Sequence, residues 1–370
     1  MATNPSAIRA LELARTRLDE ALAAAPDDPK LLLLRGRADE RLEQFDHAAQ
    51  FFRRAAGLFA AMGDRPQEAA AKVEAGVALA RAGLLSSAWT HFASALQLYR
   101  QADDEVGATT ARLALAQAKI DALQPAEAEP VLRTCIAPLT TAEDFGRLCW
   151  VHQQLARIRR DTGDIEGALR EARAAVEGAA KKKDPLRFGQ YLSEVAELHH
   201  RLGNLGKARQ YQEKAQPYLV DDDPLGALAG FERLAEIAAA SLPTATREEL
   251  DAQRGMLVAA VVFADRHGRP GHQGRLRAHQ ARVALALRHD EAAHELLSRA
   301  VQLLHQAGDP RGSAPAFVAL ARASWRVGLR DDARAALERA RSFFHMLGEA
   351  ESAAEVVSLK QAAEAGTWTP

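Results

Sequence analysis

Histidines are the side chains in this chain whose type and spacing come nearest to a metal site. Six of the twelve histidines lie between His267 and His305, and the segment HDEAAH places His289 and His294 five residues apart. The HExxH spacing of zinc sites keeps two imidazoles on one face of a helix, whereas a spacing of five turns them apart. We therefore expect surface or turn histidines here and no bound metal.

Two other segments have residue types that could bind phosphate or calcium. GRPGHQG (268–274) contains glycines that could cradle a phosphate, but it lacks the lysine of a P-loop and no predicted strand precedes it. The run Asp221–Asp223 could attract calcium, and a solvated charge run explains it equally well. Because no Ser/His/Asp or Cys/His grouping has local motif support either, we expect neither enzyme activity nor a cofactor.

Composition and the two cysteines indicate a soluble cytoplasmic protein. The 48 Lys and Arg balance the 49 Asp and Glu, so no excess of positive charge calls for a nucleic-acid partner. Cys135 and Cys149 stand fourteen apart, which fits neither a zinc pair nor a redox CxxC motif, and we expect buried free thiols. No apolar run reaches the about 18 residues of a membrane span, so we expect no membrane insertion.

The elements that must position any site form an internal repeat of about forty residues. The alanine of the phrase DIEGA, Ala168, returns at a step of forty on both sides. The first copy of this alanine, Ala14, precedes the next by 34 residues instead of forty. A shifted copy, Ala252, fits between Ala208 and Ala293. The anchor positions are Ala14, Ala48, Ala88, Ala128, Ala168, Ala208, the shifted Ala252, Ala293 and Ala333.

Residues at fixed distances from each anchor predict one face of a helix. A small residue stands seven positions after every anchor, and small, large, small at i, i+4 and i+7 is a packed helical face. The residues four positions after the anchors are mostly large and apolar: Leu18, Phe52, Phe92, Leu132, Ala172, Gln212, Met256, Leu297 and Leu337.

Turn residues separate the helices within and between the repeats. Gly83, Gly163, Gly203 and Gly328 stand five before their anchors, where a left-handed helix cap is expected, and Glu43, Leu123, Arg247 and Arg288 depart from this rule. Between repeats, an aspartate precedes each apolar-periodic run as a predicted N-cap. These aspartates are Asp64, Asp104, Asp144, Asp184, Asp223 and Asp309. In the irregular sixth repeat, Thr246 and Glu249 predict a capping box.

This pattern resembles the tetratricopeptide repeat family, with repeats extended from 34 to about 40 residues. The matching features are the small first-helix residue, the anchor alanine, the large residue after it and the small residue three further on. The resemblance implies an all-α, right-handed α-solenoid of about eight helix-turn-helix repeats. We expect a lone helix in front (about 6–24) and a closing helix behind (about 349–364).

The predicted domains follow from the same repeats. We expect N-terminal repeats over 1–265, a hinge at 266–275, C-terminal repeats over 276–348, and a closing helix with a disordered tail over 349–370. The tail proper is the segment TWTP (367–370).

The resemblance also implies where a partner would bind. In this family the concave surface is lined by first-helix positions, which lie 18, 15, 11, 8 and 7 residues before each anchor. They hold eleven cations, including Lys30 and Arg275, against the acids Glu40, Asp121, Asp161 and Glu197. The candidate binding residues, here called the first-helix arginines, are Arg37, Arg41, Arg81, Arg157, Arg160, Arg201, Arg282, Arg322 and Arg326.

The predicted function is a non-catalytic interaction scaffold or adaptor that holds a protein or peptide segment in its concave groove, where arginine forks would suit an acidic segment. Arginines that only solvate a helical face are the alternative interpretation of the same pattern. A second hypothesis is a sensing repeat domain that changes curvature when a ligand or peptide binds. Self-association is possible. No clamp built from asparagines is expected, because only Asn4 and Asn204 occur in the chain.

Overall fold

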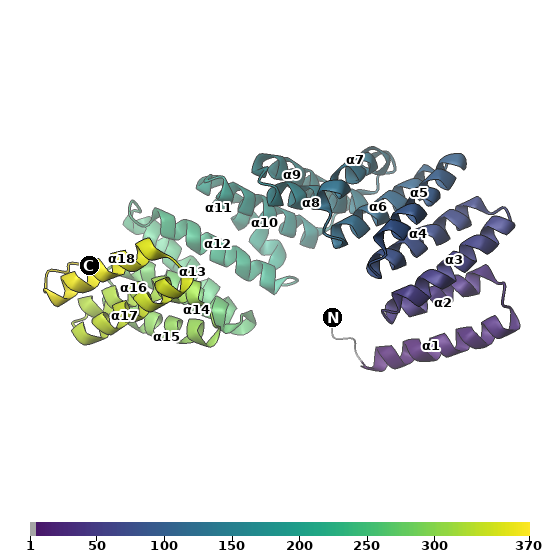
Figure 1. Cartoon of the computed structure of the whole chain (residues 1–370). Coiled ribbons are helices and arrows are strands. Elements are labelled where there is room, and N and C mark those ends of the chain that lie inside the picture. Colours follow the sequence, from purple (N-terminus) through teal and green to yellow (C-terminus); the bar gives the residue numbers. More distant parts are fainter. Residues whose placement is uncertain (1–4) are drawn as a thin grey trace. The chain divides into compact units, whose positions relative to one another are not determined.

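A computed structural model describes residues 5–370, and in that part of the chain it shows eighteen α-helices and no β-strand (Figure 1). The predicted all-α class is therefore confirmed. By their contacts the helices form two compact units, one ending at Lys182 and the other beginning at Lys183.

In the first unit, helices α1 to α9 follow one another in chain order, each joined to the next by a short turn (Figure 1). α1 packs on α2 without forming a repeat of its own. The bounds are α1 Pro5–Ala24, α2 Pro29–Arg41, α3 Phe45–Ala61, α4 Arg65–Arg81, α5 Leu85–Gln101, α6 Glu105–Asp121, α7 Pro125–Thr141, α8 Phe145–Asp161 and α9 Ile165–Lys182.

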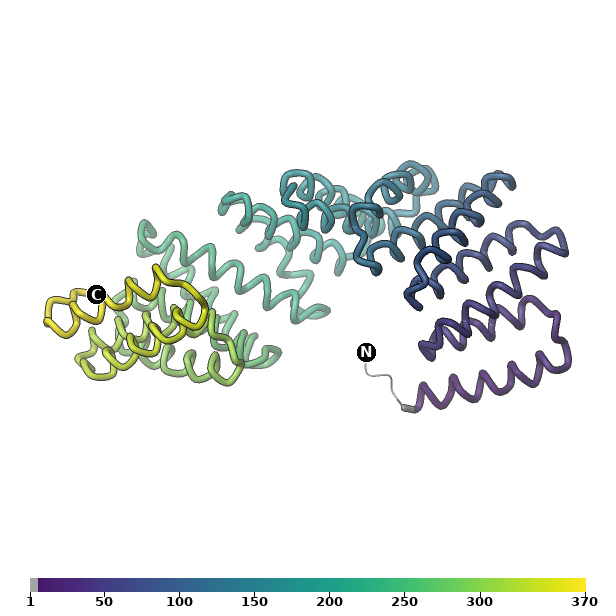
Figure 2. Tube along the Cα trace, in the orientation of Figure 1, coloured from purple at the N-terminus to yellow at the C-terminus, as the bar shows by residue number. Residues whose placement is uncertain are grey.

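The second unit contains helices α10 to α18, and its last helix packs on α17, as the end of the trace in Figure 2 shows. The bounds are α10 Pro185–Arg201, α11 Leu205–Leu219, α12 Pro224–Ser241, α13 Arg247–His267, α14 Pro270–Ala286, α15 Asp290–Gln306, α16 Pro310–Arg326, α17 Arg330–Leu347 and α18 Ala350–Glu364.

The predicted repeats correspond to the helix pairs α2–α3, α4–α5, α6–α7, α8–α9, α10–α11, α12–α13, α14–α15 and α16–α17. Within each pair the two helices pack against each other. The lone first helix and the closing last helix also lie where the sequence predicts them, at Pro5–Ala24 and Ala350–Glu364. The solenoid of about eight repeats is confirmed.

Seven of the nine predicted anchor alanines are fully buried in the core, whereas Ala14 of the lone helix α1 is exposed. All of those from Ala48 to Ala208, together with Ala293 and Ala333, have no exposed surface. The large residues that follow them, such as Phe52 and Leu297, are equally buried. Small residues allow two helix backbones to approach, and the large side chain fills the space that remains. Both cysteines are buried free thiols, as expected.

A bulkier side chain at an anchor should disrupt this packing. We predict that Ala88→Leu or Ala208→Leu lowers the free energy of unfolding by about 1–3 kcal/mol, because the added carbons have no space between the two helices. Chemical denaturation followed by circular dichroism measures the change. Ala60→Leu, at an exposed position of α3, is the matched control and should have little effect. If the anchor variants unfold like the parent, the packing interpretation is wrong.

The predicted register of the sixth repeat is wrong by one residue. Ala252, the shifted anchor, is exposed, whereas Gln253, Leu257 and Ala260 are buried at the spacing i, i+4 and i+7. The helix that carries them begins with the predicted capping box, in which Thr246 and Glu249 bond each other's backbone amides. An alanine-rich helix has candidate small residues in neighbouring registers, so small size alone did not identify the inward face.

The predicted turn conformation is confirmed, and three of the four departures share it, whereas Arg247 is instead the first residue of α13. Gly83, Gly163, Gly203 and Gly328 have positive φ angles between 72° and 88°. Glu43, Leu123 and Arg288 adopt the same left-handed conformation in their own turns, with φ between 59° and 64°. The inter-repeat aspartates all cap their helices through a side-chain oxygen. Non-glycine residues in this conformation lose stability because Cβ crowds the following carbonyl.

Leu123 allows a direct test of that strain. Its φ is 59° and its side chain is 89% exposed, so little packing is lost on its removal. We predict that Leu123→Gly leaves the free energy of unfolding unchanged or raises it by up to about 1 kcal/mol. Leu84→Gly, at an ordinary φ of −86°, should instead lower it by about 0.5–1 kcal/mol. Equal losses in the two variants would contradict the assigned turn conformation.

The expected disorder of the tail 367–370 is wrong. Trp368 is 7% exposed and packs on Trp325, with ring centroids 5.1 Å apart. The backbone amides of Thr367 and Trp368 both donate to the carbonyl oxygen of Ala362. The buried side chain of Trp368 therefore holds the segment 367–370, although its other residues are typical of a disordered chain end.

The predicted hinge at 266–275 stays a prediction. In the structure most of this segment is helical, since α13 ends at His267 and α14 begins at Pro270. Gln273 donates hydrogen bonds of 3.3 Å to the carbonyl oxygens of Ala264 and Gly268 across the turn. The two compact units meet elsewhere in the sequence, between Lys182 and Lys183.

Candidate functional site

In the first unit, most of the first-helix arginines have a carboxylate partner. Arg37 bonds Glu74 on the next first helix, with Nε to Oε2 at 2.9 Å. Arg81 bonds Glu40 at 3.0 Å, from the following repeat back to the preceding one. Pairs of this kind at a solvated surface contribute little to stability, and they partly neutralise the predicted basic face.

The arginines of the fourth and fifth repeats are also near acids. Arg157 and Arg160 both approach Asp161, at 4.0 and 3.2 Å, and Arg201 bonds Glu197 at 2.7 Å. These arginines therefore do not form a surface free of acidic groups. In the described chain, Arg41 of α2 is exposed and forms no hydrogen bond or ion pair.

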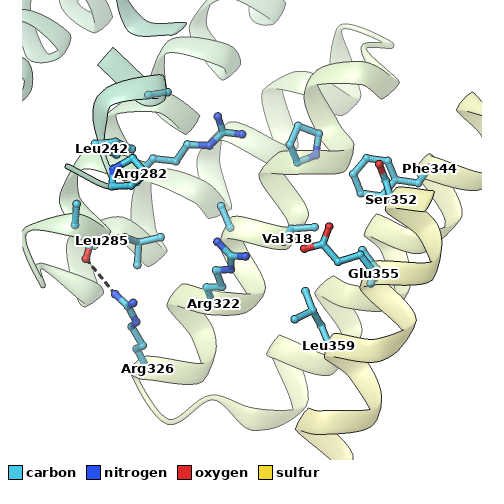
Figure 3. Close-up of a pocket in the computed structure, with 16 residues that line it drawn as sticks. Leu242, Arg282, Leu285, Val318, Arg322, Arg326, Phe344, Ser352, Glu355 and Leu359 are labelled. Carbon is cyan, nitrogen blue, oxygen red and sulfur yellow. Dashed lines mark hydrogen bonds between the residues drawn. The ribbon is translucent and has the colours of Figure 1, made fainter. Parts of the chain in front are cut away.

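The last three first-helix arginines come together in one cavity of the second unit. Arg282 of α14 and Arg322 and Arg326 of α16 line a space of about 480 Å³. Figure 3 shows their side chains extending into this hollow from two neighbouring helices. We call it the arginine cavity.

The walls of the arginine cavity are largely apolar. α14 and α16 form its floor, the turn after α12 closes one side and α18 closes the other. Arg322 and Glu355 extend from facing helices in Figure 3, and Glu355 is the only acid among the described residues of the lining. The apolar lining residues are Ala239, Leu242, Pro243, Leu285, Ala286, Pro315, Val318, Ala319, Phe344, Val356 and Leu359.

Arg326 is fixed in place by several acceptors. Its Nη1 donates to the carbonyl oxygen of Leu285 at 3.0 Å and to Oδ1 of Asp290 at 3.2 Å. Its Nε donates to the carbonyl oxygen of Pro370 at 3.1 Å. The positive charge of Arg326 is therefore largely balanced, and its guanidinium has a defined orientation at the edge of the cavity.

Arg282 and Arg322 have no such partners. Within residues 5–370 neither guanidinium forms a hydrogen bond or an ion pair, including with Glu355. Burial lowers the pKa of Arg282, and the charge of Arg322 lowers it further. Two cations that repel each other beside an apolar wall would both be stabilised by a bound anion.

His279, one turn before Arg282 on α14, adds no positive charge to this region. Burial lowers its pKa to about 4, and the charges of Arg282 and Arg275 act in the same direction. Its imidazole is therefore neutral near pH 7. Arg275, another of the sampled cations, is paired with Asp309 at 2.7 Å and with Glu232 at 3.1 Å.

Part of this site was not predicted from the sequence. The repeat spacing identified Arg282, Arg322 and Arg326, but it gave no reason to separate them from the paired arginines of the first unit. The wall formed by α18, with Glu355 and Leu359, lies outside the repeat pattern. The only available signal was that a closing helix must cover the face of the last pair.

Two further properties of residues 5–370 bear on the chemistry. In this range no group of three or more His, Cys, Asp or Glu side chains is arranged to hold a metal ion. None of the helices in it combines the length and the apolar character that crossing a membrane requires.

Comparison with known proteins identifies the fold. A signal transduction ATPase with a tetratricopeptide repeat sensor from Pyrococcus horikoshii matches 98% of this chain at 16% identity, with a TM-score of 0.57. The match covers 55% of that protein, so this chain spans about half its length. No protein-family model matches the chain, and no curated protein is similar to it in sequence.

Two other solved structures are similar to this chain with TM-scores below 0.5. BtubC from P. vanneervenii has 20% identity over 59% of this chain and 92% of its own, with a TM-score of 0.46. Aspartyl phosphate phosphatase F from Bacillus subtilis has 13% identity over 91% of this chain and 92% of its own, with a TM-score of 0.47. The Pyrococcus likeness and the helix pairs together confirm the tetratricopeptide-like repeat fold.

Proposed function

We propose that this tetratricopeptide-like repeat chain is a non-catalytic interaction protein, and that its second unit anchors an acidic segment of a protein partner in the arginine cavity. One observation carries the proposal. Arg282 and Arg322 line the same cavity, and neither has a carboxylate partner among the described residues. A partner that supplies an anion would satisfy both guanidinium groups.

The chemistry of the cavity fits an acidic residue next to an apolar one. A guanidinium donates two parallel hydrogen bonds to a carboxylate or phosphate, which makes arginine suited to such groups. Leu285, Val318 and Leu359 offer an apolar wall beside these donors. A space of about 480 Å³ is within the usual range of binding pockets. Glu355 would repel a second acid and so would favour a segment with its charge on the arginine side.

The paired arginines have a secondary role in this proposal. Arg37, Arg81 and Arg201 already hold carboxylates, so an incoming acid would have to displace an existing partner. They would add long-range attraction for an acidic segment, and salt would screen that attraction. The specific contact would be made in the second unit.

The test is a capture experiment with matched variants. Immobilised parent protein and the variant Arg282→Gln/Arg322→Gln are exposed to native lysate, and the retained proteins are identified by mass spectrometry. We expect proteins retained by the parent to be lost from the double variant and kept by Arg41→Gln, which removes an unpaired cation of the first unit. For a purified partner, loss of both forks should weaken binding by about 10- to 100-fold.

Two outcomes would contradict the proposal. One is that the double variant retains the same proteins with the same affinity and the same salt dependence. The other is that affinity is lost only when Arg157, Arg160 and Arg201 are reversed to glutamate, which would place binding at the fourth and fifth repeats. A partner-induced change in the radius of gyration, measured by small-angle scattering, would favour the sensing hypothesis over a rigid scaffold.

A further inference from the structure

We propose that the segment 367–370 is a releasable latch, which occupies a recognition slot next to the arginine cavity and restrains anion binding there. The slot is formed by Trp325, Arg326 and Arg330. Only the regulatory part of this inference rests on the proposed function, because the slot and its occupant are defined by their own contacts.

The latch is held by one side chain and a few backbone groups. Trp368 is 7% exposed and its ring lies on that of Trp325, with centroids 5.1 Å apart and planes inclined by 52°. Two residues further on, the carbonyl oxygen of Pro370 accepts a 3.1 Å hydrogen bond from Nε of Arg326. The segment thus presents an aromatic ring followed by an acceptor oxygen.

The slot has the composition of a protein-binding hot spot. Trp325 is 8% exposed while the latch is in place, and the guanidinium of Arg330 lies 3.7 Å from the centre of its ring. Tryptophan and arginine are the residue types that dominate binding energy at protein interfaces. A stacked guanidinium also keeps the indole in a fixed position. The slot is therefore prepared to receive an aromatic side chain whether or not Trp368 supplies it.

The contacts of the segment suit release. Thr367 and Thr369 are exposed, so the described segment buries one large side chain and no more. Segments with few buried apolar groups open at low free energy, independently of the rest of the fold. α18, by contrast, buries Ala353, Val356 and Ala363 against its neighbours, and it can stay in place when the latch leaves.

Arg326 couples the slot to the arginine cavity. It lines the cavity, and its guanidinium is shared among Asp290, the carbonyl of Leu285 and the carbonyl of Pro370. When the latch leaves, the Nε donor loses its acceptor and becomes available to a bound anion. Release of the latch should therefore strengthen anion binding, and a segment with an aromatic residue two positions before an acceptor oxygen should compete for the slot.

The first experiment tests the slot in the full chain. Trp368→Ala vacates it, and the probe is an acetylated and amidated peptide with the sequence Gly-Thr-Trp-Thr-Pro, followed by saturation-transfer difference NMR. A free peptide lacks the advantage of attachment, so binding in about the millimolar range is expected. We expect binding to the Trp368→Ala chain, much weaker binding to the parent, and none when the tryptophan of the peptide is alanine. Equal binding to both chains, or to neither, would overturn the latch.

The second experiment tests the regulation, with inorganic phosphate as the probe in calorimetric titrations. We expect phosphate to bind the Trp368→Ala chain about 2- to 10-fold more tightly than the parent, since one additional charged donor is freed. Circular dichroism shows whether both chains are equally folded. Phosphate binding that is unaffected by Arg282→Gln/Arg322→Gln would contradict the proposed function. Phosphate binding that depends on these arginines but not on Trp368 would instead refute the latch.

Discussion

Replacing Asp39 with alanine should lower the free energy of unfolding of the N-terminal repeats by about 3–5 kcal/mol, the loss typical of breaking a buried ion pair. Asp39 of α2 has no exposed surface and forms an ion pair with Arg35, one turn earlier on the same helix. Arg35 also donates from Nε to Asp19 of α1 at 2.6 Å and lies over the ring of Phe51. Without Asp39, a largely buried guanidinium keeps its charge but loses its innermost partner.

The pKa of Arg35 shows that both acids stabilise its charge in the parent protein. Burial disfavours its charge, but hydrogen bonds to Asp19 and Asp39 outweigh burial and raise the pKa. Arginine does not lose its proton in proteins, so Arg35 stays charged in the Asp39→Ala variant as well, and the cost cannot be relieved by loss of a proton. Chemical denaturation, together with hydrogen exchange of the α1–α4 amides, would measure the loss and show that it is local, as expected for a repeat protein.

Two comparisons make this prediction specific. Glu40→Ala removes the partner of Arg81 at a half-exposed surface pair and should change stability by less than about 1 kcal/mol. The joint replacement Arg35→Met/Asp39→Leu should recover most of the loss, because apolar residues of similar size often replace buried ion pairs without penalty. An Asp39→Ala variant as stable as Glu40→Ala would show that Asp39 is not structurally important.

The burial of Asp39 could not be predicted from the sequence. The repeat pattern predicted the helix pairs because small and large residues recur at fixed distances, and burial follows directly from that recurrence. Asp39 lies on a predicted first helix among charged residues, and nothing in its neighbourhood distinguishes it from an exposed acid. Its ion-pair partner Arg35 also bonds Asp19 of α1, a helix that packs on α2 and does not belong to a repeat.

The candidate site shows the same limit. Spacing gives the first-helix arginines equivalent positions in their repeats, but it does not give their partners, and two of these lie in neighbouring repeats: Arg37 bonds Glu74 and Arg81 bonds Glu40. Which arginine stays unpaired depends on side-chain directions across two helices. The arginine cavity further needs α18, and the latch needs Trp368, which the pattern assigned to a disordered tail.

Gln212 is a departure from the repeat pattern whose partners Ser193 and Arg233 lie on other helices. The pattern predicts a large apolar residue there, and the structure has a fully buried glutamine that accepts a hydrogen bond from Ser193 and contacts Arg233 of α12. Burial lowers the pKa of Arg233, against the influence of Glu197 and Glu236. A polar residue at a core position of the repeat is tolerated here because three helices supply its partners.

The pairing of small and large residues can be tested most directly at Gly36 and Phe52, in the first repeat. Phe52 has no exposed surface, and a Cβ placed on Gly36 would lie 2.5 Å from its Cε1. We predict that Phe52→Ala lowers the free energy of unfolding by about 3–5 kcal/mol, because a cavity remains between α2 and α3. Gly36→Ala alone should lower it by about 1–3 kcal/mol through overpacking.

The decisive result is the double variant. In the Phe52→Ala background the space above Gly36 is empty, so Gly36→Ala should no longer be destabilising and should even recover part of the loss, giving a coupling energy above about 1 kcal/mol. Gly57→Ala is the control: it lies in α3 with nothing within 4 Å of an added Cβ, and should raise stability by about 0.5–1 kcal/mol in both backgrounds. If Gly36→Ala costs the same with and without the Phe52 ring, contact with that ring is not the reason for glycine at this position. Small residues in the first helix would then reflect backbone approach alone, and the large residue of each repeat would have to be explained separately.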